Sequence, residues 1–141
     1  MLNPVIQAEA TGCGIASVAN ILGKTYLEMK AIANAMGIYA EDESLWSDTQ
    51  YVRKMLAQAG VATSPNEMAF ISWHTLPDLA LLAIKPHQRD GKHFWHWVVF
   101  KRENGGSAVL DSASYLPTNI RTDFDEMHPA WFIEVSQRSF G

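Results

Sequence analysis

The sequence predicts an α+β domain in which N-terminal helices pack on a mainly antiparallel sheet. Apolar residues recur at helical spacing as far as Gly60, and short strand-like apolar runs separated by turn residues follow it. Helices followed by a series of neighbouring strands are typical of this class. With 141 residues, of which 48% are hydrophobic, the chain is expected to form a single domain spanning residues 1–141.

Two helices are expected in the first part of the chain. The first covers residues 15–22 and ends at Gly23, since glycine is the residue that most often terminates a helix. Thr25 and Glu28 have the spacing of a capping box, in which each side chain satisfies a backbone N–H of the other residue. They are expected to begin a second helix, which runs to Gly37.

A third helix and the strands follow an acidic loop at residues 38–46. Ser47 and Gln50 repeat the capping-box spacing, which predicts a helix from there to Gly60. Strands are then predicted at residues 61–63, 79–85, 94–101, 107–110 and 131–135. Pro86 is expected to end the second of these strands, and the run 104–106, Asn-Gly-Gly, is expected to form a hairpin turn.

Composition and charge exclude several classes of partner. The net charge is −4 and no cluster of basic residues is present, which argues against nucleic acid binding. No apolar run approaches the roughly 20 residues of a membrane span, and the first residues do not resemble a signal peptide. A single cysteine cannot form an internal disulfide, so a cytoplasmic location is expected.

Neither a cofactor nor a metal ion is expected. A metal site would have to combine His87, His93 and His96, with or without Cys13. His93 and His96 lie three positions apart on a predicted strand, so their side chains point to opposite faces of the sheet. The sequence also lacks the cysteine pairs and paired histidines of common zinc sites.

Cys13 is the most informative residue of the chain. Glycines flank it on both sides, and the first predicted helix begins beside it. A helix N-terminus offers unpaired backbone N–H groups and a positive dipole end, which favour a thiolate. Gln7 precedes it by six positions, and a glutamine amide can donate to an oxyanion. A single cysteine is more commonly a small buried residue, so the spacing of the two residues is what favours a nucleophile.

The candidates for a general base are five histidines, of which His96 is favoured. It lies inside an aromatic strand, where a buried imidazole needs a polar partner, whereas His93 is expected in the preceding loop. The hairpin pairs position 96 with roughly position 112, which brings Asp111 close to His96. We expect Asp111 to accept the Nδ1 proton of His96, leaving Nε2 to take the thiol proton.

These residues resemble the bacteriocin-processing peptidases, a papain-like family that cleaves leader peptides after a double glycine. The matching segments are Gln7 to Gly14 with the small and apolar helix that follows, His96 to Phe100, and the strand that ends at Asp111. The resemblance covers roughly residues 5–115. Gly12 stands where an aspartate often precedes the cysteine of the family, and Ser112 stands where a proline often follows the aspartate.

The resemblance implies a stand-alone domain with the papain-like cysteine peptidase fold that hydrolyses a peptide or amide bond through a thioester. Cys13 would be the nucleophile, His96 the base and acid, Asp111 the residue that orients His96, and Gln7 an oxyanion donor. The expected partner is a peptide or protein substrate. A transamidase or deamidase with the same triad, and a non-catalytic peptide-binding domain, are the alternatives. Four tryptophans either line a substrate groove or pack in the core: Trp46, Trp73, Trp95 and Trp97.

Overall fold

The structure, a computed structural model, describes residues 4–8, 11–89, 91–103 and 105–136. In these residues an antiparallel sheet has strand order β1-β6-β2-β3-β4-β5. The strands are β1 (Met68–Ala69), β2 (Leu79–Arg89), β3 (Lys92–Glu103), β4 (Gly106–Leu110), β5 (Ile120–Arg121) and β6 (Trp131–Glu134). The helices are α1 (Cys13–Leu22), α2 (Tyr26–Ala35), α3 (Gln50–Gln58) and α4 (Phe124–Met127), with short 3-10 turns η1 (Glu43–Leu45) and η2 (Trp73–Thr75).

The first two helices form where the sequence predicts them. Gly23 follows α1 with a φ of 71°, a left-handed conformation that glycine adopts without steric cost. At the start of α2, the Glu28 N–H donates to Thr25 Oγ1 at 3.1 Å and the Thr25 N–H donates to Glu28 Oε1 at 2.9 Å, so the capping box is confirmed. None of the helices in the described ranges is long and apolar enough to cross a membrane.

The third helix forms, but the capping box predicted at its start is wrong. Thr49 is the N-cap residue of α3 and makes no capping bond with its side chain. The Gln50 N–H instead donates to Asp48 Oδ1 at 3.0 Å. An aspartate two residues earlier therefore satisfies the first helical N–H, and Ser47 is not needed for this purpose.

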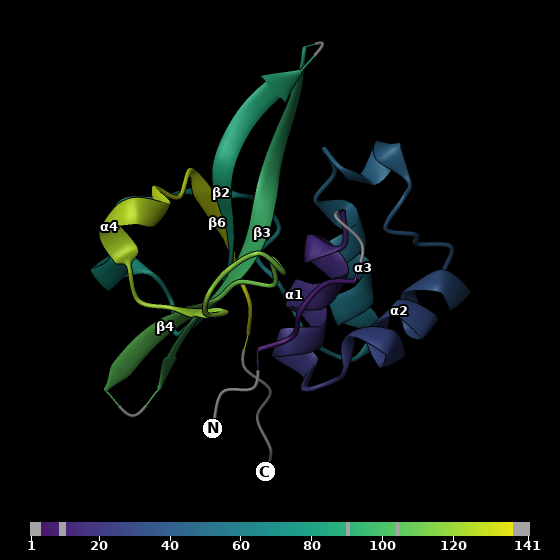
Figure 1. Cartoon of the computed structure of the whole chain (residues 1–141), viewed down its shortest axis with the longest axis horizontal. Helices are drawn as coiled ribbons and strands as arrows, with labels where there is room; N and C mark the ends of the chain where they lie inside the picture. The colour runs from purple at the N-terminus through teal and green to yellow at the C-terminus, as the bar shows by residue number, and fades with distance from the viewer. Residues whose placement is uncertain (1–3, 9–10, 90, 104, 137–141) are drawn as a thin grey trace.

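The hairpin of β2 and β3 is longer than predicted and extends beyond the rest of the sheet (Figure 1). Pro86 does not end the strand, because a β-bulge removes it from the ladder and pairing resumes at His87 and Phe94. Lys85 takes a φ of 52° within this bulge. Residues 87–89, which lie beyond the predicted end of this strand, are consequently part of β2.

The strands predicted at 94–101, 107–110 and 131–135 are confirmed with small changes of boundary, whereas the strand predicted at 61–63 is wrong. The short elements β1, β5 and α4 are among those that were not predicted. The β3–β4 ladder runs from Glu103 and Gly106 to Val99 and Leu110, while the predicted turn residue Asn104 lies outside the described residues. Residues 61–63 contribute only one bridge, from Thr63 to Val135. The elements β1, β5 and α4 have two to four residues each, too few for a periodic pattern.

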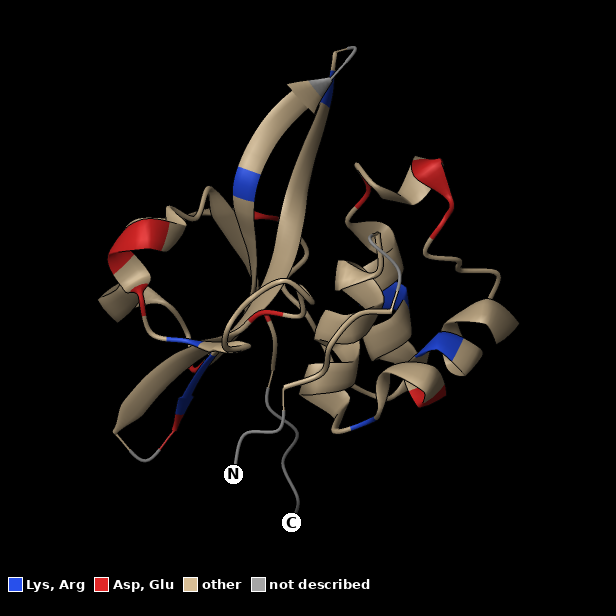
Figure 2. Cartoon of the chain, in the orientation of Figure 1, with Lys and Arg blue, Asp and Glu red and all other residues tan. Residues whose placement is uncertain are grey.

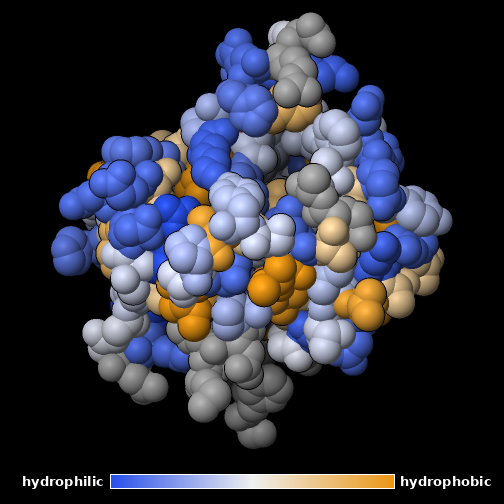
Figure 3. Space-filling model, viewed as in Figure 1, coloured by the Kyte–Doolittle hydropathy of each residue, from blue (hydrophilic) through white to orange (hydrophobic). Residues whose placement is uncertain are grey.

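The sheet lies between the helices α1 to α3 on one face and α4 on the other (Figure 1). An apolar layer covers each of the two faces. On one face, α1, α2 and α3 pack against alternate residues of β2, β3 and β6, including Leu81, Val99 and Ile133. On the other face, Phe100 and its neighbours are covered by η2 and α4. The surface in Figure 3 is mainly hydrophilic with separated hydrophobic residues, because the apolar side chains are used in these two layers.

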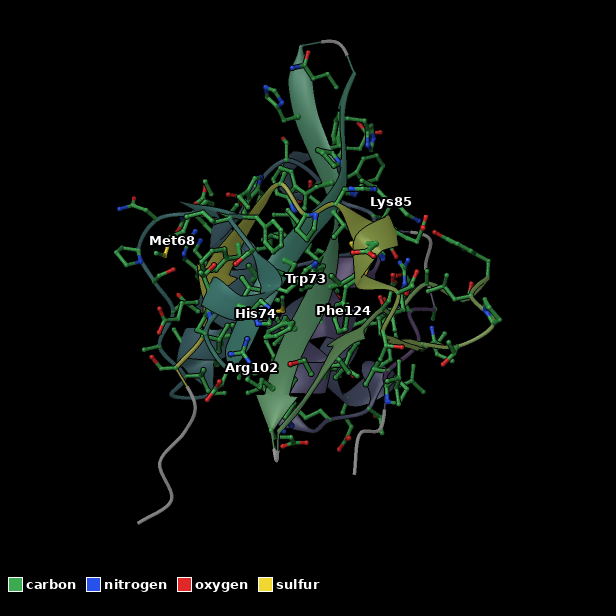
Figure 4. The ribbon with its side chains drawn as sticks, turned by 90° about the vertical axis from the view of Figure 1, so that its left-hand side faces the viewer. Met68, Trp73, His74, Lys85, Arg102 and Phe124 are labelled. Carbon is green, nitrogen blue, oxygen red and sulfur yellow. The ribbon has the colours of Figure 1, made fainter. Side chains whose placement is uncertain are left out.

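The second layer is held by an arginine clamp and an aromatic group. Arg102 on β3 donates through Nη2 to the Trp73 carbonyl and through Nη1 to the Leu76 carbonyl, each at 2.9 Å. The ring centroids of Trp73 in η2 and Phe124 in α4 lie 4.8 Å apart. Both residues are labelled in Figure 4. Trp73 therefore belongs to this layer and not to a substrate groove.

The two predicted capping boxes give a matched test of the helix boundaries. Thr25→Ala is expected to lower the free energy of unfolding by about 1 kcal/mol, because a backbone N–H of α2 loses its acceptor. Ser47→Ala is expected to change it by less than about 0.5 kcal/mol, because Ser47 makes no cap. Urea denaturation of both variants measures the difference, and equal losses would contradict the assignment of the caps.

Candidate active site

Cys13 lies where the N-terminus of α1 meets the edge of β3. It is the first residue of α1, Gly12 is the N-cap residue, and the thiol is partly exposed. The β3–β4 ladder ends at Val99, and two residues earlier the Trp97 N–H donates to Cys13 Sγ at 3.5 Å. The sulfur thus sits between a helix N-terminus and a strand N–H, both of which favour negative charge on it.

His96 and Asp111 form a hydrogen-bonded pair beside this sulfur. His96 Nε2 lies 2.7 Å from Asp111 Oδ1, and the carboxylate has no exposed surface. The predicted proximity is correct, but the expected roles of the ring nitrogens are reversed. Asp111 takes Nε2 of the ring, so Nδ1 is the nitrogen left for the hydrogen bond between His96 and Cys13.

The electrostatics of the pair favour an imidazolium. Burial alone lowers the pKa of His96, but the hydrogen bonds to Asp111 and to Cys13 outweigh it and raise the pKa to about 9. Burial likewise opposes ionisation of Asp111, yet the hydrogen bond from His96 and further donors leave its pKa below the usual value. At neutral pH a protonated ring therefore lies between the cysteine sulfur and a carboxylate.

Gln7 is tied to the residue after Asp111. Its backbone N–H donates to the Ser112 carbonyl at 3.0 Å, and the Ser112 hydroxyl donates to Gln7 Oε1 at 2.7 Å. The residue is 9% exposed, so it is not a surface glutamine. Because Ser112 engages the amide oxygen, the amide NH₂ group is oriented away from Ser112. The sequence placed Ser112 only as a departure from the family pattern and gave no signal of this contact.

Two further residues that contact Asp111 were not predicted. Arg121 Nη1 donates to Asp111 Oδ2 at 3.0 Å, and Asn119 Nδ2 donates to the Asp111 carbonyl at 2.7 Å. Both lie in or beside β5, in a stretch without a recognisable sequence pattern. Arg121 and Asp123 stand two positions apart, which permits a local ion pair, but nothing in their sequence links them to Asp111.

Tyr51 on α3 is the other residue that sequence reasoning missed. A Cβ atom at Gly14 would lie 2.1 Å from the Tyr51 hydroxyl oxygen, so glycine is required by this buried ring. The Trp97 side chain hydrogen-bonds to Tyr51. Burial, and after it the negative charge of Cys13, raise the pKa of Tyr51. The close approach of the Tyr51 ring therefore accounts for the glycine after Cys13.

A pocket of about 550 Å³ opens onto Cys13 and His96. Its walls are largely aromatic, and three of the four candidate tryptophans line it. Glu43 stands on the side of η1, whereas His87 and Lys92 stand on the hairpin of β2 and β3. Figure 2 shows that acidic residues gather in and beside η1. The aromatic residues of the lining are Trp46, Tyr51, Phe94, Trp95 and Trp97.

Two other candidate histidines lie apart from the pair of His96 and Asp111. His93 lies within β3, not in a loop as predicted, and pairs across the hairpin with Gln88. His87 stacks on Phe94 with ring centroids 5.6 Å apart. Within the described part of the chain, no group of three or more His, Cys, Asp or Glu side chains is arranged to hold a metal ion.

Comparison with known proteins places this geometry in a known fold. No protein-family model matches the chain, and no curated protein sequence does. Among solved structures, the chain is similar to the crystal structure of a double glycine motif protease from an AMS/PCAT transporter in complex with the leader peptide. The TM-score is 0.64 over 98% of this chain and 93% of that chain. The chain has a papain-like cysteine peptidase fold. At 16% sequence identity, the likeness concerns the fold.

The contact between Gly14 and Tyr51 can be tested by mutation. Gly14→Ala is expected to cost about 1–3 kcal/mol of stability, because the added methyl group overlaps a buried ring. The cost should disappear when Tyr51→Ala removes the ring, since alanine otherwise favours a helix over glycine by about 1 kcal/mol. Urea denaturation of the two single variants and the double variant measures the coupling. An equal cost of Gly14→Ala in both backgrounds would contradict the assignment.

Proposed function

We propose that this protein is a cysteine peptidase that cleaves a peptide or amide bond through a thioester intermediate. The arrangement that carries the proposal is the series Cys13, His96 and Asp111, in which a protonated ring lies between a sulfur at a helix N-terminus and a buried carboxylate. The papain-like fold supports it, because the similar structure is that of a protease.

The reaction follows from these positions. The Cys13 thiolate attacks the carbonyl carbon, and the resulting tetrahedral intermediate collapses when the imidazolium of His96 protonates the leaving amine. The acyl group is then held as a thioester on Cys13, and His96 is neutral. Neutral His96 takes a proton from a water molecule, the hydroxide attacks the thioester, and the acid product leaves. The thiolate and the imidazolium are restored.

The oxyanion of each tetrahedral intermediate needs donors, and two groups are suited to this role. The backbone N–H of Cys13 belongs to the first turn of α1, where N–H groups have no helical acceptor. The Gln7 amide oxygen is held by Ser112, which turns the NH₂ group of the same amide toward the opposite side. We propose these two donors as the oxyanion hole.

The substrate that fits the site is a peptide. The protease to which the chain is similar was crystallised with a leader peptide. The pocket beside Cys13 has aromatic walls and both signs of charge at its rim, which suit an extended peptide with mixed side chains. A transamidase or deamidase would form the same thioester. It would differ from a peptidase in the group that accepts the acyl group or in the amine that leaves.

Labelling of Cys13 by iodoacetamide tests the nucleophile without knowledge of the substrate. We expect fast labelling below about pH 7, where an ordinary thiol, with a pKa of about 8.5, reacts slowly. His96→Ala should slow labelling at that pH at least tenfold, because the imidazolium no longer stabilises the thiolate. His93→Ala is the matched control and should leave the rate unchanged. Slow labelling that is indifferent to His96 would overturn the proposal.

Cleavage assays distinguish a peptidase from a binding domain on the same scaffold. Wild-type protein, incubated with a mixed peptide library that includes double-glycine sequences, is expected to produce cleaved peptides detectable by mass spectrometry. Cys13→Ala should give none while it retains peptide binding, since alanine keeps the Cβ atom and removes only the sulfur. Cleavage that survives Cys13→Ala would rule out the mechanism. If both proteins bind peptides, Cys13 of the wild type labels as slowly as an ordinary thiol and no peptide is cleaved, the non-catalytic binding domain is favoured.

A further inference from the structure

The two oxygens of Asp111 serve different partners. Oδ1 accepts from His96 Nε2 at 2.7 Å and from the Ala113 N–H at 3.1 Å. Oδ2 accepts from Arg121 Nη1 at 3.0 Å. The carboxylate therefore lies between two cationic groups, one that takes part in proton transfer and one that keeps its charge at all relevant pH values.

Arg121 is itself fixed by an exposed carboxylate. Its Nε and Nη2 atoms donate to the two oxygens of Asp123 at 3.0 and 2.6 Å, which is the paired geometry that guanidinium groups form with carboxylates. The Arg121 side chain is 13% exposed, whereas that of Asp123 is 46% exposed. β5 holds the arginine in register, since Arg121 pairs with Val109 on β4, two residues before Asp111.

The groups around His96 thus alternate in charge. They are Cys13 from α1, Asp111 after β4, Arg121 from β5 and Asp123 after it. A buried carboxylate with only the imidazolium as partner would become an uncompensated anion each time His96 gives up its proton. This uncompensated negative charge would raise the proton affinity of the His96 ring. The ring would then be a poorer acid toward a leaving amine.

We propose that Arg121 is a positioning residue that balances the charge of Asp111, so that Asp111 stays ionised and orients His96 in both protonation states. The inference rests on the proposed peptidase function for its role in turnover. Its geometric basis, the shared carboxylate, does not depend on the substrate. Arg121 acts through Asp111 and does not touch the reacting atoms.

The titration of His96, followed by NMR of its ring proton, tests this role. The measurement is made in Cys13→Ala protein, so that no thiol titrates with the ring. Arg121→Gln keeps a hydrogen-bond donor but loses the charge, and is expected to raise the pKa of His96 by about one unit, a tenfold change in proton affinity. Arg121→Lys keeps the charge and should restore most of the original value.

Arg53→Gln is the matched control. Arg53 has a similarly buried side chain and pairs with Glu67 at 2.9 Å, but it has no contact with Asp111 or His96. Its loss should lower stability without moving the titration of His96. If Arg121→Gln lowers stability as Arg53→Gln does and leaves the titration unchanged, Arg121 is only a structural anchor and the inference is wrong. A shift of equal size in Arg121→Lys would also overturn it.

The two proposals fail in different ways. The failure of the peptidase proposal is seen in wild-type protein, as slow labelling of Cys13 that is indifferent to His96. The failure of the Arg121 inference is seen in the ring titration, which uses protein without the thiol. If Arg121→Gln shifts the titration of His96 but Cys13 of the wild-type protein is unreactive, the role of Arg121 in balancing the charge of Asp111 is kept. The peptidase proposal is then rejected.

Discussion

The buried carboxylate of Asp111 is the constraint on which the rest of the site depends. A carboxylate without exposed surface must have its charge and its lone pairs satisfied by the protein. Its side chain accepts from His96, Arg121 and the Ala113 N–H, and its carbonyl accepts from Asn119. Each of these contacts fixes a neighbouring segment, so the loop after β4, strand β5 and the ring of His96 are positioned together.

The thiol is placed by the junction of the two halves of the fold. The helical half supplies Cys13 at the first turn of α1, and the sheet supplies the Trp97 N–H and the ring of His96. Tyr51 from α3 fills the space beside Gly14 and contacts Trp97 through a side-chain hydrogen bond. The position of the sulfur therefore depends on packing between helices and sheet and not on α1 alone.

The similar protease structure shares the fold over nearly the whole chain at 16% identity. Such divergence is compatible with a common fold because a core tolerates many apolar substitutions that keep volume and pattern. The polar contacts around Asp111 are less interchangeable, because each buried donor or acceptor needs a partner at a defined distance. Ser112 with Gln7, and Arg121 with Asp111, are solutions of this kind in the present chain.

The sequence alone determined the local elements and the order of the chemical groups. The capping box at Thr25, the turn at Gly23 and the hairpin that brings Asp111 to His96 all depend on neighbouring residues or on a short ladder. That residues 1–141 form a single domain stays a prediction. Ser47 failed as a cap because another nearby side chain, that of Asp48, reaches the same N–H.

Only the tertiary structure decided how the site is assembled. Which nitrogen of His96 is left for the sulfur depends on which one the buried Asp111 carboxylate takes. Tyr51 reaches the site from α3 and Arg121 reaches it from β5. The residues next to them in sequence do not predict these contacts, because contacts between distant segments follow from packing and strand register. Local sequence thus specifies which groups are present and which elements carry them, whereas the long-range fit of helices on the sheet sets their distances and their charge states.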